Sequence, residues 1–305
     1  MPKGISTFRS SQAADQYGQR YDDLVEAYWP VPQDELDLPS RFGTTRVRVS
    51  GEGDAVPLLL VHPTAGSSAG WYPLIKPLCA GRRVFTPDTI GGAGRSVQTA
   101  PITSVEDLVT WLDEVLDGLH LDRVHIVGYS EGGWIAASHA ALTNQRERIA
   151  TLTLIEPAGA IERVPTGFLL NMIVRGARTM LARDKPTAVR KFNDWMNGDV
   201  ELTDAQIDLL LAGMGSFRQE LPRPQRLSDD ALRGIAAPTL LLLGADTKLY
   251  DPASVQERAL NLIPAAEVEI IPQAGHGLAF QYPDLVTERI LKHMTSGNRS
   301  DTPKT

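Results

Sequence analysis

The sequence predicts an α/β fold with a mostly parallel central sheet that is flanked by helices. Short apolar runs typical of strands recur along the chain and alternate with helical patterns. One of these runs, 124–127, leads into Gly-Tyr-Ser-Glu-Gly at 128–132, a G-x-S-x-G pattern that a helical stretch follows. The chain has 305 residues and is 42% hydrophobic, which suits one large α/β domain with a sizeable core.

The predicted elements follow one another along the chain. A helix over about 13–29 ends at Pro30, and two short strands follow within 36–50. Further strands are predicted at 57–61, 83–86, 123–127, 151–155, 239–243 and 267–271. The clearest helical pattern covers 105–119, and Thr103 with Glu106 offers a capping box at its start. Ligands of such sheets bind beyond the carboxyl ends of the strands, so residues that follow these runs are site candidates.

Ser130, the central residue of the pentapeptide, is the predicted nucleophile. A tight turn from strand to helix leaves little room around the backbone, and the glycines on both sides let neighbouring chain approach. The turn exposes the serine hydroxyl at the carboxyl end of the sheet, in a strained conformation. The amide of Glu131 is expected to point at an oxyanion that forms beside the serine.

His276 is the predicted base, because a nucleophilic serine needs one. It lies between Gly275 and Gly277 on a loop that follows the last predicted strand, 267–271. Position therefore favours it over four other histidines, which lie inside predicted elements or near helix ends: His120, His125, His139 and His293.

Three acidic residues are candidates for the carboxylate that orients this histidine. Asp246 follows the strand at 239–243 and is favoured because no structural role explains it. Asp251 also follows that strand, but it precedes Pro252 and a helical pattern, which is typical of a helix N-cap. Glu156 is the third candidate, because it ends the strand at 151–155 and that end also faces the site.

Over 36–293 the chain resembles the α/β-hydrolase superfamily, and within it a serine-nucleophile, carboxylesterase-like subgroup. Besides the residues above, His62-Pro63-Thr64 resembles the family's His-Gly-x oxyanion loop. The resemblance implies that the amide of Thr64 is the second oxyanion donor. It also implies an α/β-hydrolase fold with a helical cap.

Three segments depart from the family pattern, the first at Pro63, which replaces the family's glycine in the oxyanion loop but need not donate a hydrogen bond. Residues 88–96 resemble the D-x-x-G-x-G-x-S turn but contain one extra residue. The family usually places its acid three positions after the glycine that ends the strand, where this chain has Thr247, and Asp246 comes one position early. The identity of the acid therefore stays open at this point.

Residues 158–234 interrupt the alternation of strands and helices. They contain three helical patterns, 167–183, 186–197 and 204–219, with a capping box predicted from Thr203 and Gln206. We expect this segment to be the cap, 1–157 and 235–295 to be the core, and 296–305 to be a disordered tail. The cap is rich in methionine and aromatic residues, among them Phe168 and Met172. These side chains either line an apolar substrate pocket or only pack the cap onto the core.

The amino-acid composition limits the kinds of partner that this protein is expected to bind. The net charge is −7 and the charges are scattered, so neither nucleic acid nor an anionic membrane is an expected partner. The single cysteine, Cys79, excludes an intrachain disulfide framework and a cysteine metal cluster, and no metal or cofactor is expected. Neither a signal-peptide pattern nor a transmembrane run is recognisable, so a soluble, cytoplasmic protein is expected.

The sequence therefore predicts a serine hydrolase of small or medium apolar carboxylic esters that works through an acyl-enzyme. Lactones, thioesters, amides and carbon–carbon cleavage of activated diketones use the same chemistry and remain open. The alternative is a non-hydrolytic protein of the same fold, either a ligand receptor or a biosynthetic cyclase, that binds a small apolar molecule under the cap. Oligomeric state cannot be read from the sequence.

Overall fold

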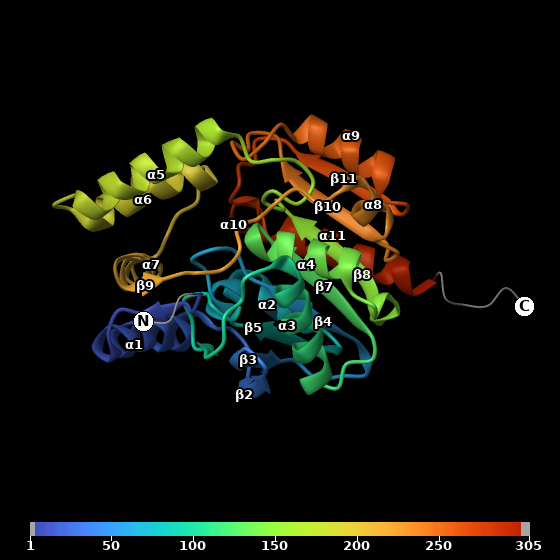
Figure 1. Cartoon of the computed structure of the whole chain (residues 1–305), viewed down its shortest axis with the longest axis horizontal. Coiled ribbons are helices and arrows are strands. Elements are labelled where there is room, and N and C mark those ends of the chain that lie inside the picture. The colour runs from blue at the N-terminus through green and yellow to red at the C-terminus, as the bar shows by residue number, and fades with distance from the viewer. Residues whose placement is uncertain (1–3, 300–305) are drawn as a thin grey trace, which may run out of the picture.

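The structure is a computed structural model that describes residues 4–299 (Figure 1). The strands are β1 (Thr7–Phe8), β2 (Gln33–Ser40), β3 (Gly43–Ser50), β4 (Ala55–Val61), β5 (Arg82–Pro87), β6 (Val97–Gln98), β7 (Val124–Tyr129), β8 (Ile149–Ile155), β9 (Phe217–Arg218), β10 (Thr239–Gly244) and β11 (Ala266–Ile271). The α-helices are α1 (Ser11–Tyr28), α2 (Tyr72–Leu78), α3 (Val105–Gly118), α4 (Glu131–Leu142), α5 (Thr166–Leu181), α6 (Lys185–Asn197), α7 (Asp204–Ser216), α8 (Asp229–Arg233), α9 (Pro252–Leu262), α10 (Leu278–Gln281) and α11 (Pro283–Arg299).

The central sheet has the predicted, mostly parallel arrangement. Its strands lie in the order β11-β10-β8-β7-β4-β5-β3-β2, and β6 pairs with β3. Every pair from β11 to β5 is parallel, whereas β3 runs antiparallel to β5 and to β2. The carboxyl ends of β4, β7, β8, β10 and β11 therefore meet at one edge, which brings the loops that follow them together.

Both faces of this sheet are buried, as expected for parallel strands. Strand β4 illustrates the alternation, because Leu58 and Leu60 point to one face while Leu59 and Val61 point to the other. The first face packs on α2, α10 and α11, and the second packs on α3, α4, α8 and α9. A core on each side holds the strand ends rigidly, which suits a site built on them.

Several predicted details are confirmed, and others are wrong. The capping box of α7 forms between Thr203 and Gln206 as predicted. The box of α3 forms one residue later than predicted, between Ser104 and Asp107. Helix α11 continues to Arg299, so residues 296–299 are helical rather than disordered, and residues 300–305 lie outside the described residues. Within 4–299, no helix combines the length and the apolar character that a membrane crossing requires.

Residues 158–234 depart from the sheet as a largely helical insertion. Figure 1 shows α5 and α6 standing apart from the sheet, while α7 lies beside the N-terminal helix α1. The sequence patterns identified these three helices but missed the short strand β9, which pairs antiparallel with β1. The N-terminal segment thus contacts the insertion as well as the core, because β1 pairs with β9 and α1 packs on α7.

Candidate active site

Ser130 occupies the turn that the sequence predicted between a buried strand and a helix. It directly follows β7 and is the N-cap of α4, with φ 55° and ψ −116°. These dihedrals are unfavourable for a residue with a side chain, so the surrounding packing must hold them. A Cβ on Gly128 would lie 2.3 Å from the carbonyl oxygen of Gly132, and one on Gly132 would lie 2.2 Å from that of Val61. The flanking glycines are therefore required by the close approach of the backbone.

His276 reaches Ser130 from the loop that follows β11. Its Nε2 atom lies 3.0 Å from the Ser130 hydroxyl oxygen. The hydroxyl of Tyr129, the residue before Ser130, donates a 2.7 Å hydrogen bond to the His276 carbonyl oxygen. Both residues of the Ser–His pair are more than nine-tenths buried, at 7% exposed each. The structure thus brings the predicted nucleophile and the predicted base into direct contact.

The glycines beside His276 make room for the insertion. The amide of Gly277 donates a 3.1 Å hydrogen bond to the carbonyl oxygen of Asn197, the last residue of α6. A Cβ on Gly277 would lie 2.7 Å from the Cβ of Asn197, and one on Gly275 would lie 3.0 Å from its carbonyl oxygen. The loop that carries His276 is therefore packed directly against the end of a helix in the insertion.

The carboxylate that contacts His276 belongs to Glu156, and the preference for Asp246 is wrong. Oε2 of Glu156 lies 3.0 Å from Nδ1 of His276, and Glu156 is fully buried. Asp246 is exposed, and its amide donates to the carbonyl oxygen of Ala274. Asp251 caps α9 as its sequence context indicated, accepting from the amides of Ala253 and Ser254. Glu156, the third candidate, is thus the residue that the fold places beside the histidine.

The pairing of β8 with β10 explains why Glu156 takes this position. The two strands lie side by side, and the amide of Glu156 donates to the carbonyl oxygen of Leu242. The carboxylate then accepts two 2.6 Å hydrogen bonds, one from the amide of Gly244 and one from the hydroxyl of Thr247. Thr247 stands where the family usually has its acid, so the threonine supports a carboxylate that comes from the neighbouring strand. The threonine at this position was the sequence signal for such a rearrangement.

The segment with Thr64 follows β4 and is fixed by His62. The amide of Thr89 donates a 2.9 Å hydrogen bond to Nε2 of His62, so that nitrogen is unprotonated. Nδ1 then carries the proton and donates to the carbonyl oxygen of Pro63 over 2.9 Å. Burial lowers the pKa of His62, which favours this neutral form. The ring therefore anchors the start of the turn that contains Thr64.

The carboxyl group of Glu131, the residue after Ser130, is buried and accepts a hydrogen bond from the insertion. Among its neighbours is the Thr64 hydroxyl, which acts on the pKa of this carboxyl group. The amide nitrogen of the Gln219 side chain also reaches that carboxylate, at 3.0 and 3.3 Å from its two oxygens. Burial raises the pKa of Glu131, although the Thr64 hydroxyl and the Gln219 side chain act in the opposite direction. The roles of the Thr64 and Glu131 amides as oxyanion donors remain predictions.

Phe168 and Met172 lie on the side of α5 that faces the rest of the insertion and the core. Phe168 is 8% exposed and stacks on Trp195 of α6, with ring centroids 5.4 Å apart. Met172 is half-buried against the same apolar cluster. The ammonium of Lys248 donates to the carbonyl oxygen of Trp195 over 2.9 Å, which ties α6 to the loop after β10. A role of Phe168 and Met172 in binding substrate remains a prediction.

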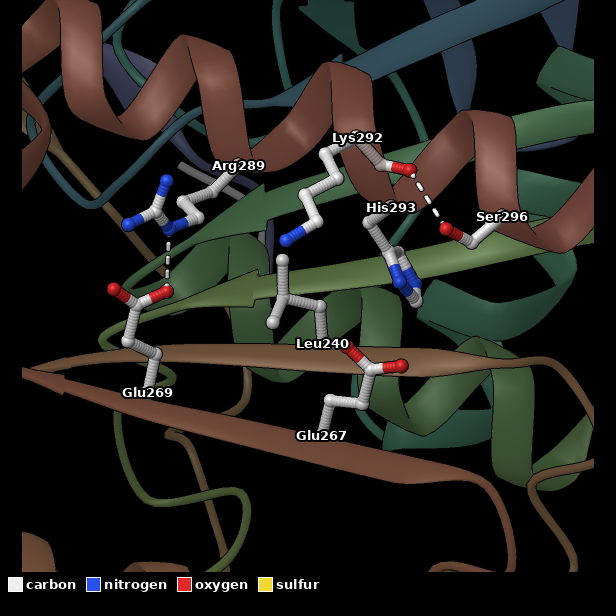
Figure 2. A pocket seen from close by; sticks show the side chains of 7 residues that line it. All are labelled: Leu240, Glu267, Glu269, Arg289, Lys292, His293 and Ser296. Carbon is white, nitrogen blue, oxygen red and sulfur yellow. Dashed lines mark hydrogen bonds and ion pairs between the residues drawn. The ribbon is translucent and has the colours of Figure 1, made fainter.

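A surface depression elsewhere contains none of these residues. It has a volume of about 250 Å³ and lies between α11 and the strands β10 and β11 (Figure 2). Its side chains are mainly charged, and Arg289 pairs with Glu269 over 2.6 Å within it. Charges that satisfy one another in this way indicate a solvated face rather than a binding site. No cluster of three or more His, Cys, Asp or Glu side chains suited to a metal occurs within residues 4–299.

Comparisons with known proteins identify the relatives of this chain. A family model described as alpha/beta hydrolase fold matches residues 56–283. Carboxylesterase YbfK of Bacillus subtilis is 29% identical over 301 residues, covering 95% of this chain and 97% of its own. A second protein of that organism, named uncharacterized carboxylesterase nap, is 31% identical and covers 90% of this chain and 91% of its own.

A solved structure is also similar over most of its length. The crystal structure of naproxen esterase, carboxylesterase NP, from Bacillus subtilis superposes with a TM-score of 0.84 at 30% identity. The superposition covers 93% of this chain and 99% of that one. Together with the elbow at Ser130 and its contact with His276, these similarities show that the chain belongs to the α/β-hydrolase superfamily, as a carboxylesterase-like member.

Proposed function

We propose that this protein hydrolyses carboxylic esters through an acyl-enzyme, with Ser130, His276 and Glu156 as the catalytic triad. The observation that carries the proposal is the continuous chain of contacts at 3.0 Å from Ser130 to His276 and at 3.0 Å from His276 to Glu156. Its carboxylesterase relatives support ester hydrolysis as the reaction. No metal or other cofactor is needed for this chemistry.

In the acylation step, the Ser130 oxygen attacks the ester carbonyl carbon while Nε2 of His276 takes the hydroxyl proton. This requires a proton on Nδ1, and the carboxylate of Glu156 fixes that tautomer by accepting the Nδ1 hydrogen. The carboxylate also stabilises the imidazolium that forms. When the tetrahedral intermediate collapses, the bond to the alcohol oxygen breaks, and the alcohol leaves with the proton from His276.

In the second step, water attacks the acyl carbon and gives its proton to Nε2 of His276. Collapse of the second intermediate breaks the bond to Ser130 and returns the proton to the serine oxygen, which releases the acid. We assign the amides of Thr64 and Glu131 as the donors that bind the oxyanion in both steps. One such donor is worth roughly 3 to 4 kcal/mol of barrier in comparable enzymes.

The substrate we propose is a small or medium apolar ester. The cap, 158–234, extends from the end of β8 to the region before β10, and Phe168 and Met172 on its inner side offer apolar contacts. Similarity to a protein described as naproxen esterase supports an ester as the substrate. A lactone or a thioester fits the same machinery. A cytoplasmic location, a core of 1–157 with 235–295, and the absence of nucleic-acid or membrane partners also remain predictions.

Covalent labelling with a fluorophosphonate tests the proposal. An activated Ser130 is expected to react, whereas Ser130→Ala is expected to lose both the label and ester turnover by several orders of magnitude while remaining folded. A ligand receptor or cyclase that does not use its serine would label poorly and would show no turnover on a panel of p-nitrophenyl esters. Such a result from the folded protein would refute the esterase function.

A further inference from the structure

The side chain of Tyr129 has no role in the reaction described above, yet it is buried next to the nucleophile. The residue is 3% exposed, ends β7 and directly precedes Ser130. Its ring packs in an apolar cluster, with its centroid 5.8 Å from that of Phe280 in α10. A phenylalanine would supply the same ring. The hydroxyl group therefore needs its own explanation, because a buried hydroxyl is costly unless it is hydrogen-bonded.

The partner of this hydroxyl is the backbone of the base. The hydroxyl donates a 2.7 Å hydrogen bond to the carbonyl oxygen of His276. Burial, and then the charge of Glu156, raise the pKa of Tyr129, so the hydroxyl keeps the proton that it donates. The ring of Tyr129 also lies beside the imidazole of His276, with centroids 5.5 Å apart. Tyr129 therefore meets both the main chain and the side chain of the base.

The loop residues on either side of His276 are held by other parts of the fold. The amide of Gly275 donates to the side-chain oxygen of Gln281 in α10 over 2.8 Å. The amide of Gly277 donates to the end of α6 over 3.1 Å. The carbonyl group of His276 itself is held by Tyr129, the residue next to the nucleophile. This hydrogen bond therefore links the segment that carries the nucleophile to the segment that carries the base.

We propose that Tyr129 is a positioning residue for the base, which fixes the place of His276 relative to Ser130. The inference rests on the proposed esterase function, because it assigns a purpose to a contact beside the proposed triad. Two adjacent residues contact His276 at its two ends: the Ser130 hydroxyl oxygen lies 3.0 Å from Nε2, and the Tyr129 hydroxyl lies 2.7 Å from the carbonyl oxygen. A base takes a proton efficiently only when it is held within hydrogen-bonding reach of the nucleophile.

Tyr129→Phe removes the hydroxyl and keeps the ring. We expect kcat on a p-nitrophenyl ester to fall by about tenfold for each active site that a fluorophosphonate titrates. Displacing a catalytic group by about 1 Å costs on the order of a hundredfold, and the other hydrogen bonds of the loop limit the displacement. KM is expected to stay within about twofold, since the loss concerns proton transfer in the transition state.

Tyr17→Phe is the matched control, because it removes another buried hydroxyl that donates to a carbonyl oxygen. Tyr17 is 2% exposed, and its hydroxyl donates to the carbonyl oxygen of Ala93 over 3.0 Å. Both variants are expected to have lower melting temperatures, but Tyr17→Phe is expected to keep its kcat per active site. A purely structural role of Tyr129 would leave kcat per active site unchanged in both. That result, or equal losses of kcat in the two folded variants, would overturn the proposal.

Rescue of the hydrogen bond provides a second variant. An amber-suppressed protein with 4-aminophenylalanine at position 129 has an amino group that can donate to the same carbonyl oxygen. It is expected to recover most of the kcat that Tyr129→Phe loses. A folded protein of this kind that is as slow as Tyr129→Phe would contradict the proposal, because the donor would then not be what sets the rate.

A proton resonance of His276 reports its position without any turnover. The hydrogen on Nδ1 lies in the 3.0 Å contact with Glu156, so it is expected to resonate far downfield in the proton NMR spectrum and to be absent from His276→Ala. Tyr129→Phe is expected to shift or broaden this resonance, and Tyr17→Phe is expected to leave it in place. An unmoved resonance in Tyr129→Phe would overturn the proposal. If the wild-type protein hydrolyses no ester, the esterase function fails and the resonance decides the role of Tyr129; if it does and Tyr129→Phe matches it, only that role fails.

Discussion

Nδ1 of His276 lies 3.0 Å from Oε2 of Glu156, although the two residues are 120 positions apart in the chain. The acid of the proposed triad thus comes from the end of β8, while the loop after β10 supplies the Gly244 amide and the Thr247 hydroxyl that hold it. The carboxylate is buried and accepts hydrogen bonds on both oxygens. These hydrogen bonds fix the carboxylate in one orientation. In that orientation it can accept the hydrogen on Nδ1 of His276 and so select this tautomer.

The first prediction separates Glu156 from the two aspartates that follow β10. Glu156→Gln keeps the shape of the side chain but removes the acceptor that selects the Nδ1–H tautomer. By comparison with similar substitutions in other serine hydrolases, kcat is expected to fall by about 10⁴-fold. Asp246→Asn changes an exposed side chain and Asp251→Asn leaves a good N-cap, so both are expected to stay within about twofold of the wild type. A severe loss in Asp246→Asn with an active Glu156→Gln would reverse the assignment.

The second prediction concerns the contact between the insertion and the histidine loop. Gly277→Ala adds a Cβ that would lie 2.7 Å from both the Cβ and the carbonyl oxygen of Asn197, so either α6 or the loop must shift. Because that loop carries His276, kcat is expected to fall by about tenfold or more, as for other displacements of a catalytic group. Gly167→Ala is the matched control, because no atom lies within 4 Å of its added Cβ, and it is expected to keep full activity. Equal activities would show that the loop yields without moving His276.

The sequence predicted most of the fold because the sheet is buried on both sides. The strands are continuous apolar runs and the turn at 128–132 has a characteristic residue pattern, so both can be recognised from the local sequence. The acid could not be chosen in this way, because the choice depends on which strand ends lie side by side and on how far each carboxylate reaches. Thr247 gave a hint, but its meaning became clear only with Glu156 within hydrogen-bonding distance. The contact of Glu131 with Gln219 joins residues 88 positions apart and left no local signal.

The third prediction concerns stability as a function of pH. His125 is fully buried in β7, where burial and then the charges of Arg82, Arg123 and His293 lower its pKa to about 3. The unfolded chain has an ordinary histidine, with a pKa of about 6.5, and therefore binds more protons between these values. Folding stability is thus complete above about pH 6.5 and falls as the pH drops below it, by on the order of 1 kcal/mol for this residue at about pH 5.5.

Thermal unfolding of His125→Gln measures this contribution. Glutamine can still bond to the hydroxyl of Thr151, which lies 2.8 Å from Nδ1 of His125, but it does not titrate. The melting temperature of the variant is expected to depend less steeply on pH between about 7.5 and 5.5 than that of the wild type. His62 and His293 also have lowered pKa values, so part of the dependence is expected to remain. Identical slopes in the two proteins would contradict the assignment to His125.

The last prediction concerns the length of the acyl chain. If the inner side of α5 lines the substrate pocket, each buried methylene is expected to add about 0.8 kcal/mol to transition-state binding until the pocket is full. The value of kcat/KM on p-nitrophenyl esters is then expected to rise from acetate and to peak at a short or medium chain. Met172→Ala and Phe168→Leu enlarge the inner side and are expected to move the peak to longer chains while fluorophosphonate labelling of Ser130 continues.

Ile173→Ala is the control on the same helix, because its side chain is 63% exposed and points away, and it is expected to leave the peak unchanged. A peak that moves equally in all three variants would reflect loosening of α5 as a whole, and a flat profile in every protein would show that the insertion does not select the acyl chain.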